Sequence, residues 1–252
     1  MKHASLFSGI GGFDLAAHWM GWENVFQVEI DGFCQKVLEK NFPNTKRYGD
    51  IKQFNGSEYR GTIDVLSGGD PCQPHSTAGA NRGLEDHRYL WPEYLRIIKT
   101  VGPSFIVNEN VSGSIANWIL DQKIVDLETS GYTCWPPLLI PAGATGALHR
   151  RDRIWLVAYS NAIRPQAFSK QLESYMGEKE NQPKSASSVD SLSREIIRRG
   201  QEEKLVTDEF PMARTDHGIP KELDAIAALG NAIVPQVAFE IFKAIKKVNE
   251  SL

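Results

Sequence analysis

The sequence has little of what marks secreted, membrane-spanning or metal-binding proteins. It holds 3 cysteines, an odd number placed far apart, which argues against a disulfide framework and against a Cys-x-x-Cys zinc site. No apolar run approaches the ~20 residues that a membrane span needs, and the first residues do not read as a signal peptide. We therefore expect a cytoplasmic protein without a metal centre.

An excess of positive charge is also missing. The formal net charge is -3, so the molecule as a whole does not attract phosphate, and any binding of nucleic acid depends on a local group of Lys and Arg side chains. The 252 residues, 41% of them hydrophobic and 23% charged, suffice for one substantial core and a small insertion. One domain with an insertion is expected.

Short apolar runs alternate with segments of helical periodicity along most of the chain. The expected strands are residues 4–8, 25–29, 63–67, 105–108, 134–140 and 154–159, and the expected helices are residues 13–19, 33–41, 90–101, 115–129 and 234–248. Strands that alternate regularly with helices form a mostly parallel sheet covered on both faces. The sequence therefore predicts a doubly wound α/β fold.

The composition changes after residue 159, where Gln, Glu, Lys and Ser dominate and apolar residues become rare. Such a segment buries too little apolar surface to fold on its own. We expect residues 160–217 to be a polar, partly disordered insertion. Residues 1–159 and 218–252 then form one domain, with the last helix packed back on the first part of the chain.

Three loops that follow expected strands favour a nucleoside ligand. The glycine-rich run Phe7-Ser-Gly-Ile-Gly-Gly follows the first strand and allows a tight turn and close approach to a ligand. Glu29 ends the second strand, where an acidic side chain accepts hydrogen bonds from a ribose. Asp50 suits the exocyclic amine of an adenine, although on its own it is better explained as a turn or cap. The three together indicate an adenosine pocket.

Two further strand ends carry reactive side chains. Cys72 follows the strand at 63–67, on a loop that Pro71 and Pro74 stiffen, and a loop thiol in the crevice of such a sheet is a candidate nucleophile. Glu109 ends the next strand and can give a proton or a hydrogen bond to a heteroaromatic ring, or simply cap a loop. Cys34 and Cys134 lie within helical and strand patterns and are expected to be buried structural residues.

A basic run precedes the strand at 154–159. Arg151 and Arg153 are two residues apart and point to the same side, where guanidinium groups can orient carbonyl or phosphate oxygens. A solvated basic edge is the alternative explanation, but it does not account for the apolar strand that follows.

In this order, the motifs resemble those of the cytosine carbon-5 DNA methyltransferases, which are Rossmann-like class I methyltransferases that use S-adenosylmethionine. Pro71-Cys72-Gln73 looks like the nucleophile loop, Glu109-Asn110-Val111 the Glu-Asn-Val motif and Arg151-Asp-Arg153 the Arg-x-Arg motif. Leu229-Gly-Asn-Ala-Ile-Val234 is similar to the last motif. The resemblance covers roughly residues 4–159 and 218–245, and so many ordered motifs are specific together.

The resemblance implies the chemistry and its residues. Cys72 would add to carbon 6 of a cytosine flipped out of duplex DNA, Glu109 would bond the ring near nitrogen 3, and Arg153 with Arg151 would hold the base carbonyl or the acid network. The implied cofactor contacts are Phe7, Ser8, Gly9, Gly11, Gly12, Glu29, Ile30, Asp50, Ile51, Asp70, Trp91, Asn231 and Ala232, with Trp91 over the methionine end. A monomer is expected, and a cognate restriction endonuclease is a candidate partner.

The chain departs from the family pattern at several positions. Asp70 stands where an apolar or small residue is usual, His75 where Phe is usual and His149 where Gln is usual, and we expect these changes to tune the loop. The insertion at 160–217, where the family reads its target, is short.

The short insertion leaves two alternatives open. One is a methyltransferase that acts on cytosine in tRNA, and the other is a non-catalytic remnant that binds DNA or cofactor. A third reading, methylation of an exocyclic amine, is suggested by Asp70-Pro71, but position 73 lacks the aromatic residue that such enzymes carry.

Overall fold

The computed structural model describes residues 1–71, 89–111, 117–141, 152–163 and 232–250. The strands are β1 (Lys2–Leu6), β2 (Glu23–Val28), β3 (Lys46–Tyr48), β4 (Val65–Gly68), β5 (Phe105–Val111), β6 (Tyr132–Cys134), β7 (Leu138–Pro141) and β8 (Asp152–Ser160). The helices are α1 (Gly12–Trp19), α2 (Gly32–Asn41), α3 (Trp91–Val101), α4 (Asn117–Thr129) and α8 (Pro235–Glu250), with 3-10 turns η1 (Ser57–Tyr59) and η6 (Asn161–Ile163).

All eight strands belong to one sheet, in the order β3-β2-β1-β4-β5-β8-β6, with β7 also paired to β8. Strands β1 to β5 are mutually parallel, and β8 is antiparallel to β5, β6 and β7. The chain runs outward from β1 in one direction and then returns to β4 on its other side. A doubly wound sheet offers a crevice at this reversal, outside the carboxyl ends of the strands, so the prediction of the fold class is confirmed.

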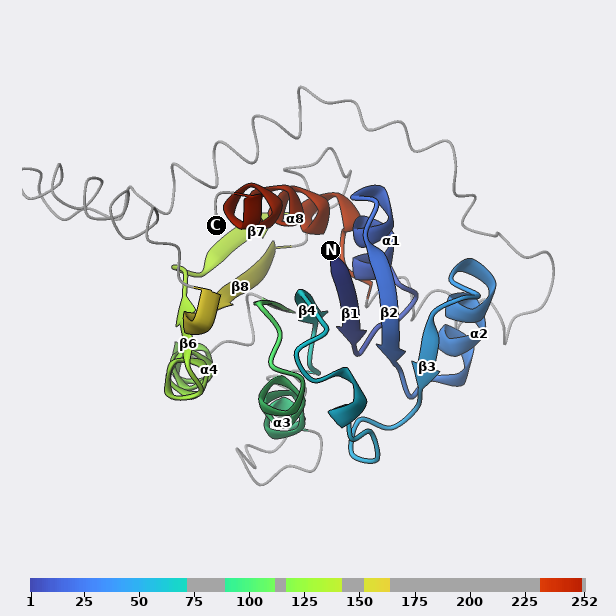
Figure 1. Cartoon of the computed structure of the whole chain (residues 1–252), viewed down its shortest axis with the longest axis horizontal. Helices are drawn as coiled ribbons and strands as arrows, with labels where there is room; N and C mark the ends of the chain where they lie inside the picture. The colour runs from blue at the N-terminus through green and yellow to red at the C-terminus, as the bar shows by residue number, and fades with distance from the viewer. Residues whose placement is uncertain (72–88, 112–116, 142–151, 164–231, 251–252) are drawn as a thin grey trace, which may run out of the picture.

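Helices cover both faces of the sheet: α1 and α8 lie on one face, and α3 and α4 on the other (Figure 1). Side chains alternate between the faces along each strand, which produces two apolar cores. Phe105, Val107 and Trp155 pack with α1 and α8, whereas Leu66, Ile106 and Leu156 pack with α3. The expected return of the last helix is confirmed, since Val237, Ala238, Ile241, Phe242 and Ile245 of α8 are all buried.

The element boundaries follow local chemistry. Asp31 caps α2 by accepting a hydrogen bond from the Cys34 N–H, and Gly102 ends α3 in the left-handed conformation that favours glycine. The expected strand at 134–140 is instead two strands, β6 and β7, because Pro136 and Pro137 lack the N–H that a continuous ladder requires. β5 is longer than expected, so Glu109 lies within the strand and not after it.

Among the described helices, none combines the length and the apolar character required to cross a membrane. The expected polar insertion at 160–217 lies outside the described residues, except for its first four positions.

Candidate active site

The loop between β1 and α1 is shaped by backbone geometry that is uncommon outside glycine. Phe7 has a φ of 51° and Gly11 a φ of 89°, both left-handed. The Gly11 N–H donates to the Ser8 carbonyl at 2.9 Å, which closes the turn. The Gly9 N–H donates to Glu29 Oε2 at 2.7 Å, so the loop and the end of β2 are joined directly.

Glu29 organises the two strand ends around it. Its other oxygen accepts from the Asp31 N–H at 2.8 Å, and its own N–H donates to the Tyr48 carbonyl at 3.0 Å. Each carboxylate oxygen has a second lone pair, so the group can still accept a hydrogen bond from a ligand hydroxyl. Residues expected on separate loops are thus held together at one edge of the sheet.

Open space and an exposed apolar side chain lie next to this loop. A Cβ at Gly9 would meet no atom of the described residues within 4 Å, and Ile30, directly after Glu29, is 71% exposed. Large apolar side chains are rarely so exposed in the described part of the chain, where only Val125 and Leu139 are comparable. The edge therefore has room for a flat apolar group beside an acceptor.

The last segment of the chain returns to the same loop. A Cβ at Gly12 would lie 2.6 Å from Ile233 Cγ1, so the start of α1 and the segment before α8 are in close contact, and only glycine fits. Ala232 is half-buried next to Ile233. Asn231 lies outside the described residues. The first and last motifs therefore meet, as the sequence predicted for the segment as a whole.

Asp50 and Ile51 differ in what they offer to a ligand. Asp50 is half-buried after β3, and its Oδ1 accepts from the Lys52 N–H at 2.9 Å, which is the turn role considered for it. The Ile51 side chain is 4% exposed and belongs to the core on the α3 face. Only the backbone of Ile51 is then available to a ligand, whereas the Asp50 carboxylate retains a free oxygen for this role.

A second group of buried polar side chains lies beneath the first loop; we call His3, Ser5, Ser8, Asp14 and Asn24 the Asp14 cluster. The Ser5 hydroxyl is 3.0 Å from Asp14 Oδ2 and 2.6 Å from the Ser8 hydroxyl. Asn24 donates its amide N–H to the Asp14 carbonyl at 2.9 Å, and its Oδ1 lies 2.7 Å from His3 Nδ1. This cluster connects the loop to the interior.

No described cation contacts the Asp14 cluster, so burial governs its titration. Burial raises the pKa of Asp14 to about 6, against the smaller opposing effect of hydrogen bonds, and lowers the pKa of His3 to about 4. Both groups are completely enclosed. The neutral imidazole donates from Nδ1 to Asn24 and accepts at Nε2 from the Ser67 hydroxyl, 2.7 Å away.

Glu109 and Arg153 face one another across the β5 and β8 pair. Arg153 Nε lies 2.7 Å from Glu109 Oε1, with side chains 15% and 9% exposed. The contact is an ion pair without the alignment of a directional hydrogen bond. A Cβ at Gly69 would lie 3.0 Å from Glu109 Oε2, so glycine allows the chain beyond β4 to pass directly over the carboxylate.

The predicted nucleophile follows Gly69 by three positions in the sequence. Pro71 is the last described residue on that side, and Cys72 and Arg151 both lie outside the described residues. The other two thiols are not suited to nucleophilic attack: burial raises the pKa of Cys34 and of Cys134 to about 12 in each case. Cys34 is buried and Cys134 half-buried, which agrees with the structural role expected of both.

Asp70 and Trp91 point into the protein interior. Asp70 Oδ1 lies 2.6 Å from Lys123 Nζ on α4 and 2.8 Å from Asn108 Nδ2. The Trp91 indole is 1% exposed, and its N–H donates to Asp126 Oδ2 at 2.8 Å. These contacts are those of core residues, so neither side chain is included in the cofactor site proposed below.

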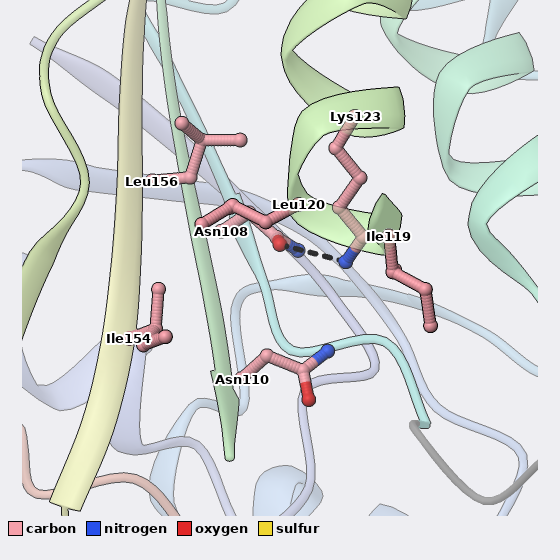
Figure 2. A pocket seen from close by; sticks show the side chains of 7 residues that line it. All are labelled: Asn108, Asn110, Ile119, Leu120, Lys123, Ile154 and Leu156. Carbon is pink, nitrogen blue, oxygen red and sulfur yellow. Dashed lines mark hydrogen bonds between the residues drawn. The ribbon is translucent and has the colours of Figure 1, made fainter. Parts of the chain in front are cut away.

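Lys123 is the polar residue that sequence reasoning missed. It is 2% exposed, contacts Asp70 and Asn108, and lies 4.8 Å from the centre of the Trp91 ring. We call Asp70, Trp91, Asn108 and Lys123 the Lys123 cluster. It adjoins a small pocket lined by Asn108, Asn110, Ile119, Leu120, Lys123, Ile154 and Leu156 (Figure 2). Of this cluster, the unusual Asp70 stood out in the sequence, but nothing there showed that Lys123 faces the sheet and pairs with it.

No group of three or more His, Cys, Asp or Glu side chains that could hold a metal ion occurs within the described ranges.

In a comparison with protein families, the model described as C-5 cytosine-specific DNA methylase matches residues 1–217. Among curated proteins, the type II methyltransferase M.Eco47II of Escherichia coli is 36% identical over 163 residues, which are 63% of this chain and 39% of that protein. M.NgoPII of Neisseria gonorrhoeae, another type II methyltransferase, is 42% identical over 119 residues, 46% of this chain and 35% of that protein. The chain thus spans less than half the length of these relatives.

Solved structures share the fold. A protein described as a DNA modification methyltransferase encoded within an Escherichia coli prophage superposes with a TM-score of 0.55 at 25% identity, over 66% of this chain and 48% of that one. DNMT2 of Spodoptera frugiperda also gives a TM-score of 0.55, at 24% identity over 66% of this chain and 51% of that one. The doubly wound sheet is therefore that of class I methyltransferases.

Proposed function

Because the chain belongs to the C-5 cytosine-specific DNA methylase family, we propose that it transfers a methyl group from S-adenosylmethionine to carbon 5 of cytosine in duplex DNA. The observation that carries the proposal is the Glu109–Arg153 ion pair, which lies directly under the chain segment that leads to Cys72. Glu109 lies near the carboxyl end of β5, and Arg153 lies beside it at the amino end of the antiparallel β8. With the thiol of Cys72, an acid and a cation are the groups that this reaction requires.

The residues around the first loop fit the methyl donor. Glu29 retains lone pairs for the ribose hydroxyls, the exposed Ile30 side chain offers an apolar surface to the adenine, and Asp50 can accept from its amine. The open space over Gly9 admits the rest of the molecule, next to Phe7, Ser8, Gly11 and Gly12. Asn231 and Ala232 would close the pocket from the last segment. S-adenosylmethionine supplies an electrophilic methyl group at this position.

The protein side of the chemistry begins with Cys72. Carbon 5 of cytosine is a poor nucleophile, so the Cys72 thiolate adds to carbon 6 and makes carbon 5 electron-rich. A bond then forms between carbon 5 and the methyl group, and S-adenosylhomocysteine leaves. Loss of the carbon-5 proton to a base and expulsion of the Cys72 thiolate restore the aromatic ring. The Cys72 thiolate is thereby regenerated, and the products are methylated cytosine, S-adenosylhomocysteine and one proton.

Glu109 and Arg153 act on the ring while Cys72 adds to it. The ring gains electron density at nitrogen 3 when carbon 6 is attacked. The Glu109 carboxyl group, in its protonated form, donates a hydrogen bond to nitrogen 3 that stabilises this charge. Arg153, already 2.7 Å from Glu109, holds the carboxyl group in place and, together with Arg151, can reach the base carbonyl. The cytosine must leave the duplex to enter this site, at a cost of a few kcal/mol.

Recognition of the target is proposed for residues 160–217. The family model match includes these residues, which supports their assignment to the same protein family as the rest of the chain. Because relatives are type II methyltransferases, we also propose a partner restriction endonuclease and action in the cytoplasm.

The test uses purified protein, duplex DNA of mixed sequence and S-adenosylmethionine with a labelled methyl group. Label is expected at carbon 5 of cytosine, and Cys72→Ala is expected to remove it completely because no other described thiol is ionisable near neutral pH. Cys34→Ala is the matched control and is expected to keep activity. Label on adenine would contradict the proposal, and preferential transfer to tRNA in a competition would replace DNA by RNA as the substrate.

A further inference from the structure

The Lys123 cluster contains a lysine in an unusual environment. Lys123 is the only buried lysine in the described part of the chain, and its side chain is 3% exposed, as is that of Asp70. Lysine is almost never buried without a partner because an unpaired ammonium loses several kcal/mol of hydration. Here Nζ lies 2.6 Å from Asp70 Oδ1 and 3.0 Å from Asn108 Oδ1, so its charge is compensated.

Lys123 contacts both flanks of the segment that carries Cys72. Asp70 lies two residues before Cys72, and Trp91 begins α3 immediately after that segment. The ammonium is bonded to the Asp70 carboxylate and lies 4.8 Å from the centre of the Trp91 ring, within cation–π distance. One cation on α4 therefore connects the point where the segment leaves the sheet with the point where it returns to a helix.

The same cluster is attached to the strand that carries Glu109. Asn108 donates to Asp70 Oδ1 at 2.8 Å and to the Gly68 carbonyl at 3.2 Å, and Asn110 donates to the Asp70 carbonyl at 3.2 Å. Asn108 and Asn110 point toward α4 (Figure 2). Because side chains alternate between the two sides of a strand, Glu109 between them points to the other side of β5. Asn108 and Asn110 are the sequence neighbours of Glu109. Their hydrogen bonds to Asp70 thus fix the main chain next to Pro71 relative to the Glu109 side chain.

An ion pair is an inefficient way to stabilise a core. Replacing a buried pair by well-packed apolar residues is often neutral or stabilising, whereas the pair fixes one geometry. Apolar Leu120, Ile154 and Leu156 adjoin the cluster, so an apolar replacement would have suitable neighbours. The arrangement therefore points to placement of the chain and not to stability as the role of Lys123.

We propose that Lys123, through Asp70, is a positioning residue for the methyl-transfer step: it sets the place of the main chain that enters Cys72 relative to Glu109. Lys123 touches neither the base nor the cofactor in this role. The inference rests on the function proposed above, since it requires Cys72 to be the nucleophile.

The decisive variant is the double substitution Asp70→Asn with Lys123→Met. It removes both charges, so no unpaired charge remains buried, and its melting temperature is expected within about 3 °C of that of the wild type. The turnover number is expected to fall about 10- to 100-fold, with the KM for S-adenosylmethionine within about twofold, because a small displacement of a reacting group is costly. The rate of covalent capture of 5-fluorocytosine DNA is expected to fall by the same factor.

The matched control removes another ion pair on a helix. Glu240 Oε1 and Lys243 Nζ are 3.2 Å apart on α8, and the Glu240 side chain is 6% exposed. Glu240→Gln with Lys243→Met is expected to change the melting temperature by a similar amount and to leave the turnover number unchanged. A purely structural role of Lys123 would give the two double variants the same activity.

Hydrogen exchange provides a readout that does not depend on turnover. Backbone amides around Asp70 and around Trp91 are expected to exchange about tenfold faster in the Asp70→Asn/Lys123→Met variant, while those of α8 keep their protection. Wild-type turnover number together with wild-type exchange in this variant would overturn the inference. An inactive wild-type protein would overturn the proposed function. In that case, unchanged hydrogen exchange in the double variant would still contradict the inference that Lys123 holds the segments around Asp70 and Trp91 in place.

Discussion

The two faces of the sheet bury polar groups in different ways. On the α3 and α4 face, the Lys123 cluster pairs a carboxylate with an ammonium at 2.6 Å. On the α1 and α8 face, the carboxyl group and imidazole of the Asp14 cluster have only neutral hydrogen-bond partners among the described residues, and their pKa values shift to about 6 and about 4. One cluster compensates its buried charges by pairing them, whereas in the other burial disfavours the charged forms of Asp14 and His3.

This difference suits the position of each cluster. The ion pair between Asp70 and Lys123 holds a fixed geometry, which is useful beneath the segment that leads to Cys72. Neutral hydrogen bonds suffice beneath the first loop, where the Gly9 N–H and the Glu29 carboxylate already fix the main chain. The comparison makes separate predictions for each cluster.

The largest effect is expected from breaking the pair on one side. Lys123→Met leaves the Asp70 carboxylate buried without its cation, which should cost about 3–5 kcal/mol of unfolding free energy. Urea denaturation at pH 7 measures this cost. Asp14→Asn at the same pH is expected to be neutral or stabilising, because it removes a carboxyl group whose ionised form burial disfavours. A cost below about 1 kcal/mol for Lys123→Met would remove the distinction between the clusters.

The second prediction isolates His3. Its folded pKa of about 4 lies below the unfolded value, so its contribution to stability is present above pH 6.5 and is lost as the pH falls through 4. In the wild type, the contribution of Asp14 to stability rises as the pH falls over nearly the same range, and this rise offsets the loss at His3. As the pH falls from 6.5 to 4, the unfolding free energy of Asp14→Asn should therefore fall by about 3 kcal/mol relative to that of the wild type. Denaturation of both proteins across this range provides the comparison.

The third prediction isolates Asp14. Its folded pKa of about 6 lies above the unfolded value, so its contribution is complete below pH 3.8 and is lost as the pH rises through 6. His3→Gln keeps a polar side chain next to Asn24 and Ser67 but removes the opposing titration. Between pH 4 and pH 6, the unfolding free energy of this variant should fall by about 3 kcal/mol relative to that of the wild type. Parallel curves for variant and wild type would show that the two groups do not compensate each other.

The smallest effect is expected from an exposed pair. Lys246 and Glu250 on α8 are 3.7 Å apart, with side chains 46% and 62% exposed. Lys246→Met should change the unfolding free energy by less than about 0.5 kcal/mol, because solvent screens such pairs. Urea denaturation beside Lys123→Met then shows that burial, and not pairing alone, gives Lys123 its large effect. A cost similar to that of Lys123→Met would contradict this explanation.

Local patterns were sufficient to predict the sheet and the groups at its edge. The glycine run after β1, Glu29 after β2 and Glu109 in β5 could be identified because each follows from strand periodicity and from the rule that ligands bind at carboxyl ends of strands. The position of Cys72 relative to them stays a prediction. The division into β6 and β7 was missed although Pro136-Pro137 signals it.

Pairings between distant residues could not be predicted in the same way. Asp70 was noticed as a departure from the family pattern and was assigned to the cofactor, because nothing in the sequence connects it to Lys123. α4 reads as a helix whether its lysine faces solvent or the sheet. Only packing decides which side is buried, and a single sequence without its fold does not contain that information.

The position of α8 in the sequence has a consequence for synthesis of the protein. α8 provides much of the apolar cover of the α1 face, and it follows every other described element in the sequence. During translation those elements can therefore form with Val65, Phe105 and Trp155 still uncovered on that side, and the loop between β1 and α1 lacks its contact with Ile233. The nascent chain presents an adhesive apolar surface, of the kind that chaperones bind, until residues 235–250 leave the ribosome. Ribosome stalling within α8 is expected to leave a chain that aggregates through this uncovered surface.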